Sequence, residues 1–297
     1  MPKDFQITTD NTCDLPMDFY INNNISVCPI GFSIDGESFD GVKENMPSEL
    51  FYKKMREGHM PITAQANPTQ IIDVFKPILE QGKDILHISF SSGLSGTYNN
   101  VLLAKNELES QFPDSKIIVI DSLAASLGEG MICFTAVELK NKGLSIDEVA
   151  NEIERSKLNA CHLFTVSDLN HLYRGGRVSK TAAFLGTLIH IKPVLFVDND
   201  GHLIPSVKVK GRKKSIETLA DKMLELISDY ECHNDIENSK IFISHGDCLE
   251  DALYLKSLVS QKTGIKDFII NPIGATIGAH SGPDTIALFF YGKSRLI

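Results

Sequence analysis

The chain has 297 residues, of which 42% are hydrophobic, an ordinary share for a folded soluble protein. A single core is not typical at this length, so we expect two domains. The formal net charge of −9 opposes binding to nucleic acid, which we do not expect as a partner. The N-terminal residues lack the layout of a signal peptide, and the longest weakly polar segment, residues 181–197, is short for a membrane span. We therefore expect a cytoplasmic protein.

The six cysteines are scattered, and none forms a C-x-x-C pair. This spacing argues against a zinc knuckle or a thioredoxin-like motif. Cys232 with His233, and His245 with Cys248, are the pairs that could ligate a metal. Buried or incidental cysteines explain the same spacing more simply, so we expect neither a metal nor a cofactor.

The first half of the chain alternates short β-rich runs with helical patterns. The runs at residues 4–9, 84–90 and 116–121 are brief, apolar and β-branched, as strands are. Strands that alternate with helices indicate a parallel sheet. The sequence therefore predicts an N-terminal α/β domain with a parallel sheet, residues 1–160.

Several helices in the sequence have recognisable ends. Asn67 and Pro68 suit the N-cap and the first position of a helix, and Gly82 suits its end. Ser145 and Glu148 have the spacing of a capping box.

The second half of the chain has a different pattern. A helix is expected near residues 180–188, and Asp200-Gly201 is a hairpin signal between strand-like residues. Further strand-like runs occur at residues 239–245, 266–273 and 285–292. We therefore predict a C-terminal α+β domain with a mixed or antiparallel sheet, residues 161–297.

The loop that follows residues 84–90 is rich in glycine and hydroxyl groups. Ser92, Ser95 and Thr97 supply hydroxyl donors, while Gly93 and Gly96 let the backbone approach a ligand. Open α/β sheets bind ligands at such loops, and the free N–H groups of a helix start favour an anion. The loop has no P-loop lysine. It therefore suits a carboxylate or phosphate.

The same loop allows two other interpretations. Gly93, Ser95 and Thr97 almost match the G-x-S-x-G nucleophile elbow, with threonine in place of the last glycine. His245 and His280 lie downstream, in the order that a hydrolase uses. Alternatively, Ser95 simply caps the helix. Anion binding, ester hydrolysis and capping all remain open at this point.

Other turns after strands carry similar residues. Asp10 and Asp14 lie in one, where they could bind a metal but more often serve as caps. Residues 121–130 form a third strand-to-helix turn, and Thr63 comes shortly before the Asn67 cap. Because such turns meet at one edge of a sheet, we expect them to share a ligand site.

Two further residues suit an anion. Arg177 follows two glycines, and its guanidinium group matches a carboxylate or phosphate, although a surface arginine is an equal alternative. His280 lies in a glycine-rich turn, residues 277–283, where it could donate to an anion or act as a base. The apolar residues of 181–197 follow the Arg177 turn and suit a ligand with a polar head and an apolar tail.

A basic run stands out in this acidic chain. It consists of Lys208, Lys210, Arg212, Lys213 and Lys214. Such a run is usually a solvated face, but it could also dock an acidic partner or a phosphoryl ligand.

Six motifs, in this order, resemble the DegV family of fatty-acid-binding proteins. They are TTDNTCDLP, ITAQANP, SSGLSGTY, DSLAASLGEG, DLNHLYRGGRVS and IGATIGAHSGPDTIAL, and they span nearly the whole chain. The resemblance implies two α/β domains, with a long-chain fatty acid such as palmitate buried between them or within the second. It implies a carrier without turnover of its own, which presents the carboxylate to a separate fatty acid kinase that makes acyl-phosphate. This role belongs to lipid transport and fatty acid metabolism, and it allows a transient contact with a membrane.

The resemblance also implies how the carboxylate is held. By position, Thr63 and Ser95 would form hydrogen bonds with it, and Ser92 and Gly96 would shape the same loop. ITAQANP departs from the family, which often reads T-S-Q-P, but it keeps Thr63.

Arg177 and His280 match the arginine and the histidine that lie near the head group in this family. There they would hold the carboxylate or assist phosphotransfer. Scattered apolar residues set the tail tunnel, so the resemblance does not carry a chain-length preference.

Overall fold

The computed structural model describes residues 3–179, 191–227 and 239–296. A parallel sheet forms in the N-terminal half, with the strand order β2-β1-β6-β7. Its strands are β1 (Phe5–Asp10), β2 (Ser26–Cys28), β6 (Asp84–Ser89) and β7 (Ile117–Asp121). The predicted parallel sheet is confirmed.

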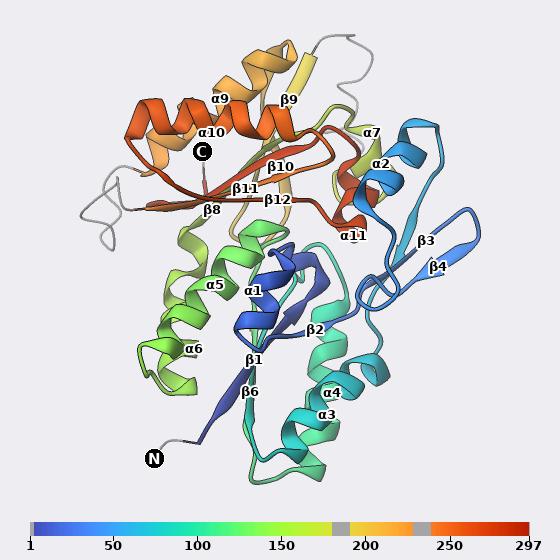
Figure 1. Ribbon diagram of the computed structural model, residues 1–297, viewed down its shortest axis with the longest axis vertical. Coiled ribbons are helices and arrows are strands. Elements are labelled where there is room, and N and C mark those ends of the chain that lie inside the picture. The colour runs from blue at the N-terminus through green and yellow to red at the C-terminus, as the bar shows by residue number, and fades with distance from the viewer. Residues whose placement is uncertain (1–2, 180–190, 228–238, 297) are drawn as a thin grey trace.

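Helices cover both faces of this sheet (Figure 1). One face packs on α3 (Pro68–Glu80) and α4 (Thr97–Gln111), and the other packs on α5 (Leu127–Asn141) and α6 (Ile146–Ser156). Short elements of this half include η1 (Asn11–Cys13), α1 (Met17–Asn22) and η2 (Lys157–Asn159).

The predicted helix ends and the hairpin are present. Asn67 caps α3 in a capping box with Gln70, and Ser145 caps α6 in the same way with Glu148. Gly201 adopts a φ of +78° in the hairpin turn, a left-handed conformation that favours glycine. Local sequence therefore determines these elements.

A six-stranded mixed sheet forms in the C-terminal half, with the order β10-β9-β8-β13-β11-β12. Only the β11–β12 pair is parallel. The strands are β8 (Ala160–Thr165), β9 (Ile191–Val197), β10 (Leu203–Lys210), β11 (Lys240–His245), β12 (Asp267–Pro272) and β13 (Ile286–Tyr291). The helix expected near residues 180–188 lies outside the described residues.

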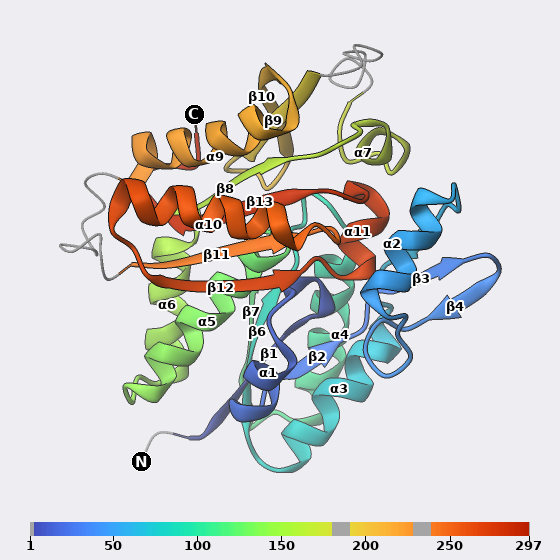
Figure 2. The same ribbon diagram turned by 45° about the horizontal axis from the view of Figure 1, so that its top comes forward.

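The two sheets share one helix. The outer face of the mixed sheet packs on α9 (Arg212–Ile227) and α10 (Leu249–Thr263), as Figure 2 shows. Its inner face packs on α5, which also packs on the parallel sheet. The helix α5 therefore contacts both halves of the molecule.

A third, three-stranded sheet was not predicted. It consists of β3 (Gly31–Ile34), β4 (Glu37–Phe39) and β5 (Ile62–Ala64), in the order β4-β3-β5. Phe32 stacks on Phe39 at 4.9 Å between ring centroids, and the sheet packs with α2 (Ser48–Arg56) against α11 (Ala275–Ser281). This packing places Thr63, on β5, beside the C-terminal half.

Within the described ranges, no helix is long and apolar enough to cross a membrane.

Candidate functional site

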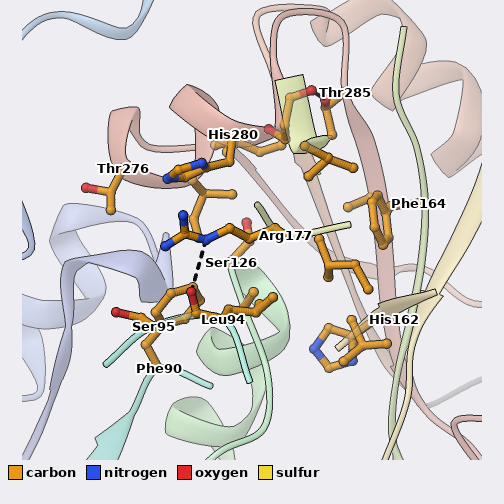
Figure 3. Close-up of a pocket in the computed structure, with 18 of the residues that line it drawn as sticks. Phe90, Leu94, Ser95, Ser126, His162, Phe164, Arg177, Thr276, His280 and Thr285 are labelled. Carbon is orange, nitrogen blue, oxygen red and sulfur yellow. Dashed lines mark hydrogen bonds between the residues drawn. The ribbon is translucent and has the colours of Figure 1, made fainter. Parts of the chain in front are cut away.

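A cavity of about 320 Å³ lies between the two large sheets. The cavity is mainly apolar, and half of the residues that line it are hydrophobic: Ile30, Phe90, Leu94, Ala125, Phe164, Leu172, Val197, Leu203, Ile273, Ile277, Ala287 and Phe289. Some of the polar residues cluster at one end of the cavity, where Arg177 lies between His280 and Ser95 (Figure 3). His162 lies on the other side of the cavity. The cavity thus combines a polar end with an apolar body.

Arg177 lies at the polar end, just after α7 (Asn170–Arg174). Its Nε donates to the carbonyl of Leu94 at 3.0 Å, and its Nη1 donates to the carbonyl of Gly175. The side chain is about half buried, and this burial lowers its pKa. Both described bonds go to carbonyls, and no carboxylate of the described chain pairs with it. The cavity therefore contains a partly desolvated positive charge that lacks a counter-ion within the described residues.

His280 lies beside this guanidinium. The Nε2 of His280 is 2.8 Å from the Oγ1 of Thr63, and Nδ1 is buried without a hydrogen-bond partner in the described residues. Burial first, and then the nearby Arg177 charge, lower the pKa of His280 to about 4. The ring is therefore neutral near pH 7. A Cβ added at Gly175 would lie 2.0 Å from Nδ1, so this glycine lets the ring approach the α7 turn.

The prediction of a turn at residues 277–283 was wrong for its first part, because His280 lies in the helix α11. Glycine disfavours a helix, but here close packing requires it. A Cβ at Gly278 would lie 2.5 Å from the Oη of Tyr52. The glycine-rich sequence thus reflects the contact of α11 with α2.

Ser95 and Gly96 line the cavity in the loop before α4. The Oγ of Ser95 lies 3.0 Å from the Oγ1 of Thr97 and accepts the backbone N–H of Thr97 at 3.2 Å. Ser95 thus supports the start of α4 while it faces the cavity. The side chain of Gln65 packs over Gly96, with its Oε1 2.1 Å from where a Cβ would lie. Ser92 is exposed, and it does not line the cavity.

A second polar group borders the cavity at the start of α5. Ser126 donates to the Oδ2 of Asp14 at 2.6 Å and lies 3.0 Å from the Oγ of Ser244. The Oδ1 of Asp14 accepts the N–H of Gly274 at 2.9 Å. Burial raises the pKa of Asp14 to about 7, opposed by these two hydrogen bonds. We call Asp14, Ser126, Ser244 and Gly274 the Asp14 junction. It joins both halves of the chain.

His162 is a cavity residue that the sequence analysis missed. It is buried on β8, its ring lies edge-on to Phe289 at 5.2 Å, and burial holds its pKa well below the usual range. A Cβ at Gly128 would lie 2.1 Å from its Nε2, so the glycine in the DSLAASLGEG motif makes room for this ring. In the sequence, that glycine does not identify the ring for which it makes room. The same analysis also passed over Gln65, Thr276, Ser281 and Thr285, all of which line the cavity.

The structure separates some of the other candidates from this site. His245 is buried, its Nδ1 accepts the N–H of Cys248 at 3.3 Å, and it does not line the cavity. Ser95 and His280 both line the cavity, but their described hydrogen bonds do not join them. The Ser–His pair of a nucleophile elbow is thus not formed in the described structure.

The remaining predicted features lie elsewhere. The basic run spans the end of β10 and the start of α9, where Arg212 pairs with Asp251 at 2.7 Å, and it does not line the cavity. Cys232, His233 and residues 181–190 of the apolar run lie outside the described residues. Val197, the last residue of that run, does line the cavity.

Comparisons with known proteins agree along almost the whole chain. A curated DegV domain-containing protein of Clostridium perfringens (strain 13 / Type A) is 41% identical over 294 residues, which are 99% of each chain. A solved structure of a DegV family protein from Thermus thermophilus, described by its fatty acid binding, has a TM-score of 0.85 and 28% identity, over 98% of this chain and 100% of that one. A DegV lipid binding protein from Thermotoga maritima has a TM-score of 0.83 and 31% identity, over 99% and 100%.

The family comparison gives the same result. Residues 4–293 match the family model described as "Uncharacterised protein, DegV family". These residues include the parallel sheet, the mixed sheet and every described residue that lines the cavity. The chain therefore belongs to the DegV family.

Proposed function

We propose that this protein binds a long-chain fatty acid in the cavity, with its carboxylate at Arg177 and its acyl chain along the apolar wall. The observation that carries the proposal is the half-buried Arg177, which has no carboxylate partner in the described structure and faces an apolar cavity. A desolvated cation strongly favours an anionic partner. The fatty acid binding of the Thermus thermophilus relative supports this ligand class.

Hydroxyl groups beside Arg177 suit a carboxylate. If Nε2 of His280 carries the proton, it donates to Thr63, and the hydroxyl of Thr63 is then free to donate to the ligand. Ser95 lies on the same cavity wall, immediately before α4, whose start favours negative charge. Hydrogen bonds to a charged group contribute about 1.5–3 kcal/mol each. Arg177, Thr63 and Ser95 thus supply the charge and the donors that one carboxylate needs.

We further propose that the protein is a cytoplasmic carrier in lipid transport and fatty acid metabolism, and that it presents the carboxylate to a fatty acid kinase. Two features of the site support a carrier over an esterase. His280 is hydrogen-bonded to Thr63 rather than to Ser95, and Ser95 is bonded to Thr97. Neither residue is therefore arranged as half of a nucleophile–base pair.

Native mass spectrometry of the purified protein, followed by solvent extraction and lipid identification, tests the binding proposal. We expect one fatty acid per chain, and stoichiometric rebinding of palmitate after delipidation. A protein that carries no lipid and also fails to bind added fatty acids of several lengths would refute it.

Incubating the loaded protein with ATP and a fatty acid kinase then tests the carrier role, since acyl-phosphate should form only when both proteins are present. Labelling of Ser95 by an active-site serine probe, with ester turnover lost in Ser95→Ala, would favour the esterase instead.

A further inference from the structure

A second cluster of polar side chains lies on the face of the parallel sheet that packs on α3. None of its residues lines the cavity. Asp10 on β1 pairs directly with Cys28 on β2, and His87 on β6 pairs with Thr8 of β1. Because Thr8 and Asp10 are two residues apart on one strand, the three side chains share one face of the sheet. Their potential ligand atoms all lie within 4.8 Å of one another. The ring of Phe75, on α3, packs edge-on to His87 at 5.2 Å between centroids and closes this side.

Two atoms at the centre of this cluster lack partners. Asp10 Oδ1 and His87 Nε2 are buried, and neither has a hydrogen-bond partner within the described residues. They lie 3.6 Å apart, which is too far for a hydrogen bond. Leaving such atoms unpaired is costly, so a buried pair of this kind calls for an explanation.

The outer atoms of the same two side chains are well held. His87 Nδ1 lies 2.9 Å from the Oγ1 of Thr8, and Asp10 Oδ2 accepts the N–H of Phe90 at 2.8 Å and the hydroxyl of Ser89 at 3.1 Å. Metal-binding histidines and carboxylates typically show this arrangement, in which the outer atom is anchored by the protein and the inner atom faces the ion. The cluster therefore has the supporting contacts of a metal site.

The charges of the cluster and the distance between Asp10 and His87 also suit a divalent ion. A thiolate, a carboxylate and a neutral imidazole together balance two positive charges. In a tetrahedral site with bonds of about 2.0–2.3 Å, neighbouring donors lie about 3.3–3.8 Å apart, a range that includes the Asp10–His87 separation of 3.6 Å. Without an ion, burial opposes charge on every member: it raises the pKa of Asp10 to about 7 and that of Cys28 well above its usual value, and it lowers that of His87 to about 3.

We propose that Asp10, Cys28 and His87 bind a divalent first-row transition metal, of which zinc best matches the mixed sulfur, nitrogen and oxygen donors. Magnesium and calcium prefer oxygen ligands only, so the thiol and imidazole exclude them as the preferred ion. The ion would join β1, β2 and β6 and stabilise the parallel sheet. Since the cluster is buried, the ion would enter while the chain folds.

Refolding tests this site independently of any lipid. The full chain is unfolded with a chelator, the chelator is removed, and the chain is refolded with or without zinc chloride. With free zinc about 100-fold above its dissociation constant, we expect a thermal midpoint raised by roughly 5 °C. After desalting, we expect one zinc per chain by elemental analysis. Less than a tenth of an equivalent of zinc, with an unchanged midpoint, would overturn the proposal.

Cobalt(II) identifies the ligands directly. Refolding with cobalt chloride should produce a thiolate-to-cobalt charge-transfer band, which sites without sulfur lack. The band should vanish in Cys28→Ser and persist in Cys133→Ser, a matched control because Cys133 is also buried but lies on α5. Metal bound without this band, or lost equally in both variants, would overturn the ligand set. If Cys28→Ser does not fold, absence of the band from the unaltered protein still overturns the proposal.

Discussion

Two polar regions border the same cavity, and they differ in where their partners come from. In the Asp14 junction, both carboxyl oxygens of Asp14 accept hydrogen bonds from the protein, from Ser126 and from the N–H of Gly274. At the other region, the described bonds of Arg177 go only to carbonyls. A buried group that the protein satisfies contributes to the fold, whereas a charge that it leaves uncompensated favours an external ion. Pairing, rather than polarity, therefore distinguishes the structural region from the binding region.

The Asp14 junction also positions the binding region. Asp14 follows η1, Ser126 precedes α5, and Gly274 is the N-cap of α11. Of these residues, only Gly274 adjoins α11, the helix that carries His280, so the hydroxyl of Ser126 can be removed without loss of the bond between Asp14 and this helix. Measuring the free energy of unfolding and the ligand affinity of the same variants distinguishes the two regions.

The largest expected effect is on stability, through Asp14. Its pKa is raised from 3.8 to about 7 in the folded protein, so between these pH values the folded state binds more protons than the unfolded state. This contribution to the free energy of unfolding is therefore full below pH 3.8 and is lost as the pH rises through about 7. At about 1.4 kcal/mol per pH unit, the loss amounts to about 4 kcal/mol.

Asp14→Asn tests this, because asparagine does not titrate. From pH 4 to pH 7, urea unfolding should show the variant gaining stability relative to the unaltered protein. For Asp18→Asn, a change at an exposed aspartate, the difference in the free energy of unfolding from the unaltered protein should stay constant from pH 4 to pH 7. Parallel pH profiles for Asp14→Asn and the unaltered protein would show that Asp14 ionises normally.

The next effect concerns ligand affinity. Arg177→Ala should weaken fatty acid binding by about 3 kcal/mol, or roughly 150-fold, because the carboxylate would lose its only cationic partner in the described site. Fluorescent fatty acid displacement measures the dissociation constant. Arg174→Ala is the matched control, since Arg174 is exposed three residues earlier and bonds to His171. Equal affinities in the two variants would remove Arg177 from the site.

Hydroxyl deletions sharpen the contrast between the two regions. Thr63→Val and Ser95→Ala should each weaken fatty acid binding by about 1.5–3 kcal/mol. Thr63→Val should change the free energy of unfolding little, whereas Ser95→Ala should also lower it by about 1 kcal/mol, because Ser95 accepts the N–H of Thr97 at the start of α4. Ser126→Ala should do the opposite, because its hydroxyl is already engaged by Asp14 and Ser244. We expect a loss of about 1–3 kcal/mol in the free energy of unfolding and a near-normal affinity. If all three variants behave alike, the distinction between the regions fails.

Local features of the fold could be predicted from sequence because their causes lie within a few residues. The side chains of Asn67 and Gln70 close one capping box, and Asp200-Gly201 closes the β9–β10 hairpin. The sheet of β3, β4 and β5 escaped prediction because its strands are only three or four residues long. Asp35, with a φ of +56°, and Gly36, with +83°, form the turn that could have revealed it.

The candidate site was predictable only in part. Thr63, Ser95, Arg177 and His280 lie in motifs, and the structure brings all four to one cavity. His162 could not be placed, because its approach to the cavity depends on the pairing of β8 with β13, across more than 100 residues of chain. The proposed metal cluster could not be predicted for the same reason, because the neighbours of Cys28 come from other strands.

The smallest expected effect concerns His280 and pH. Because burial and the Arg177 charge lower its pKa to about 4, the ring of His280 should stay neutral between pH 6 and pH 8. A histidine that titrated near its ordinary value of about 6.5 would add a positive charge below that pH and tighten carboxylate binding. We instead expect His280→Gln to change the dissociation constant by the same factor at pH 6 and at pH 8, within about twofold, since a neutral hydrogen bond to Thr63 is lost at both.

NMR of the ligand-free protein provides the direct check. The ring resonance of His280, which is assigned by its absence in the variant, should not change from pH 8 to pH 6. A midpoint near 6.5, or a variant effect that grows at pH 6, would instead make His280 part of the charge that holds the carboxylate.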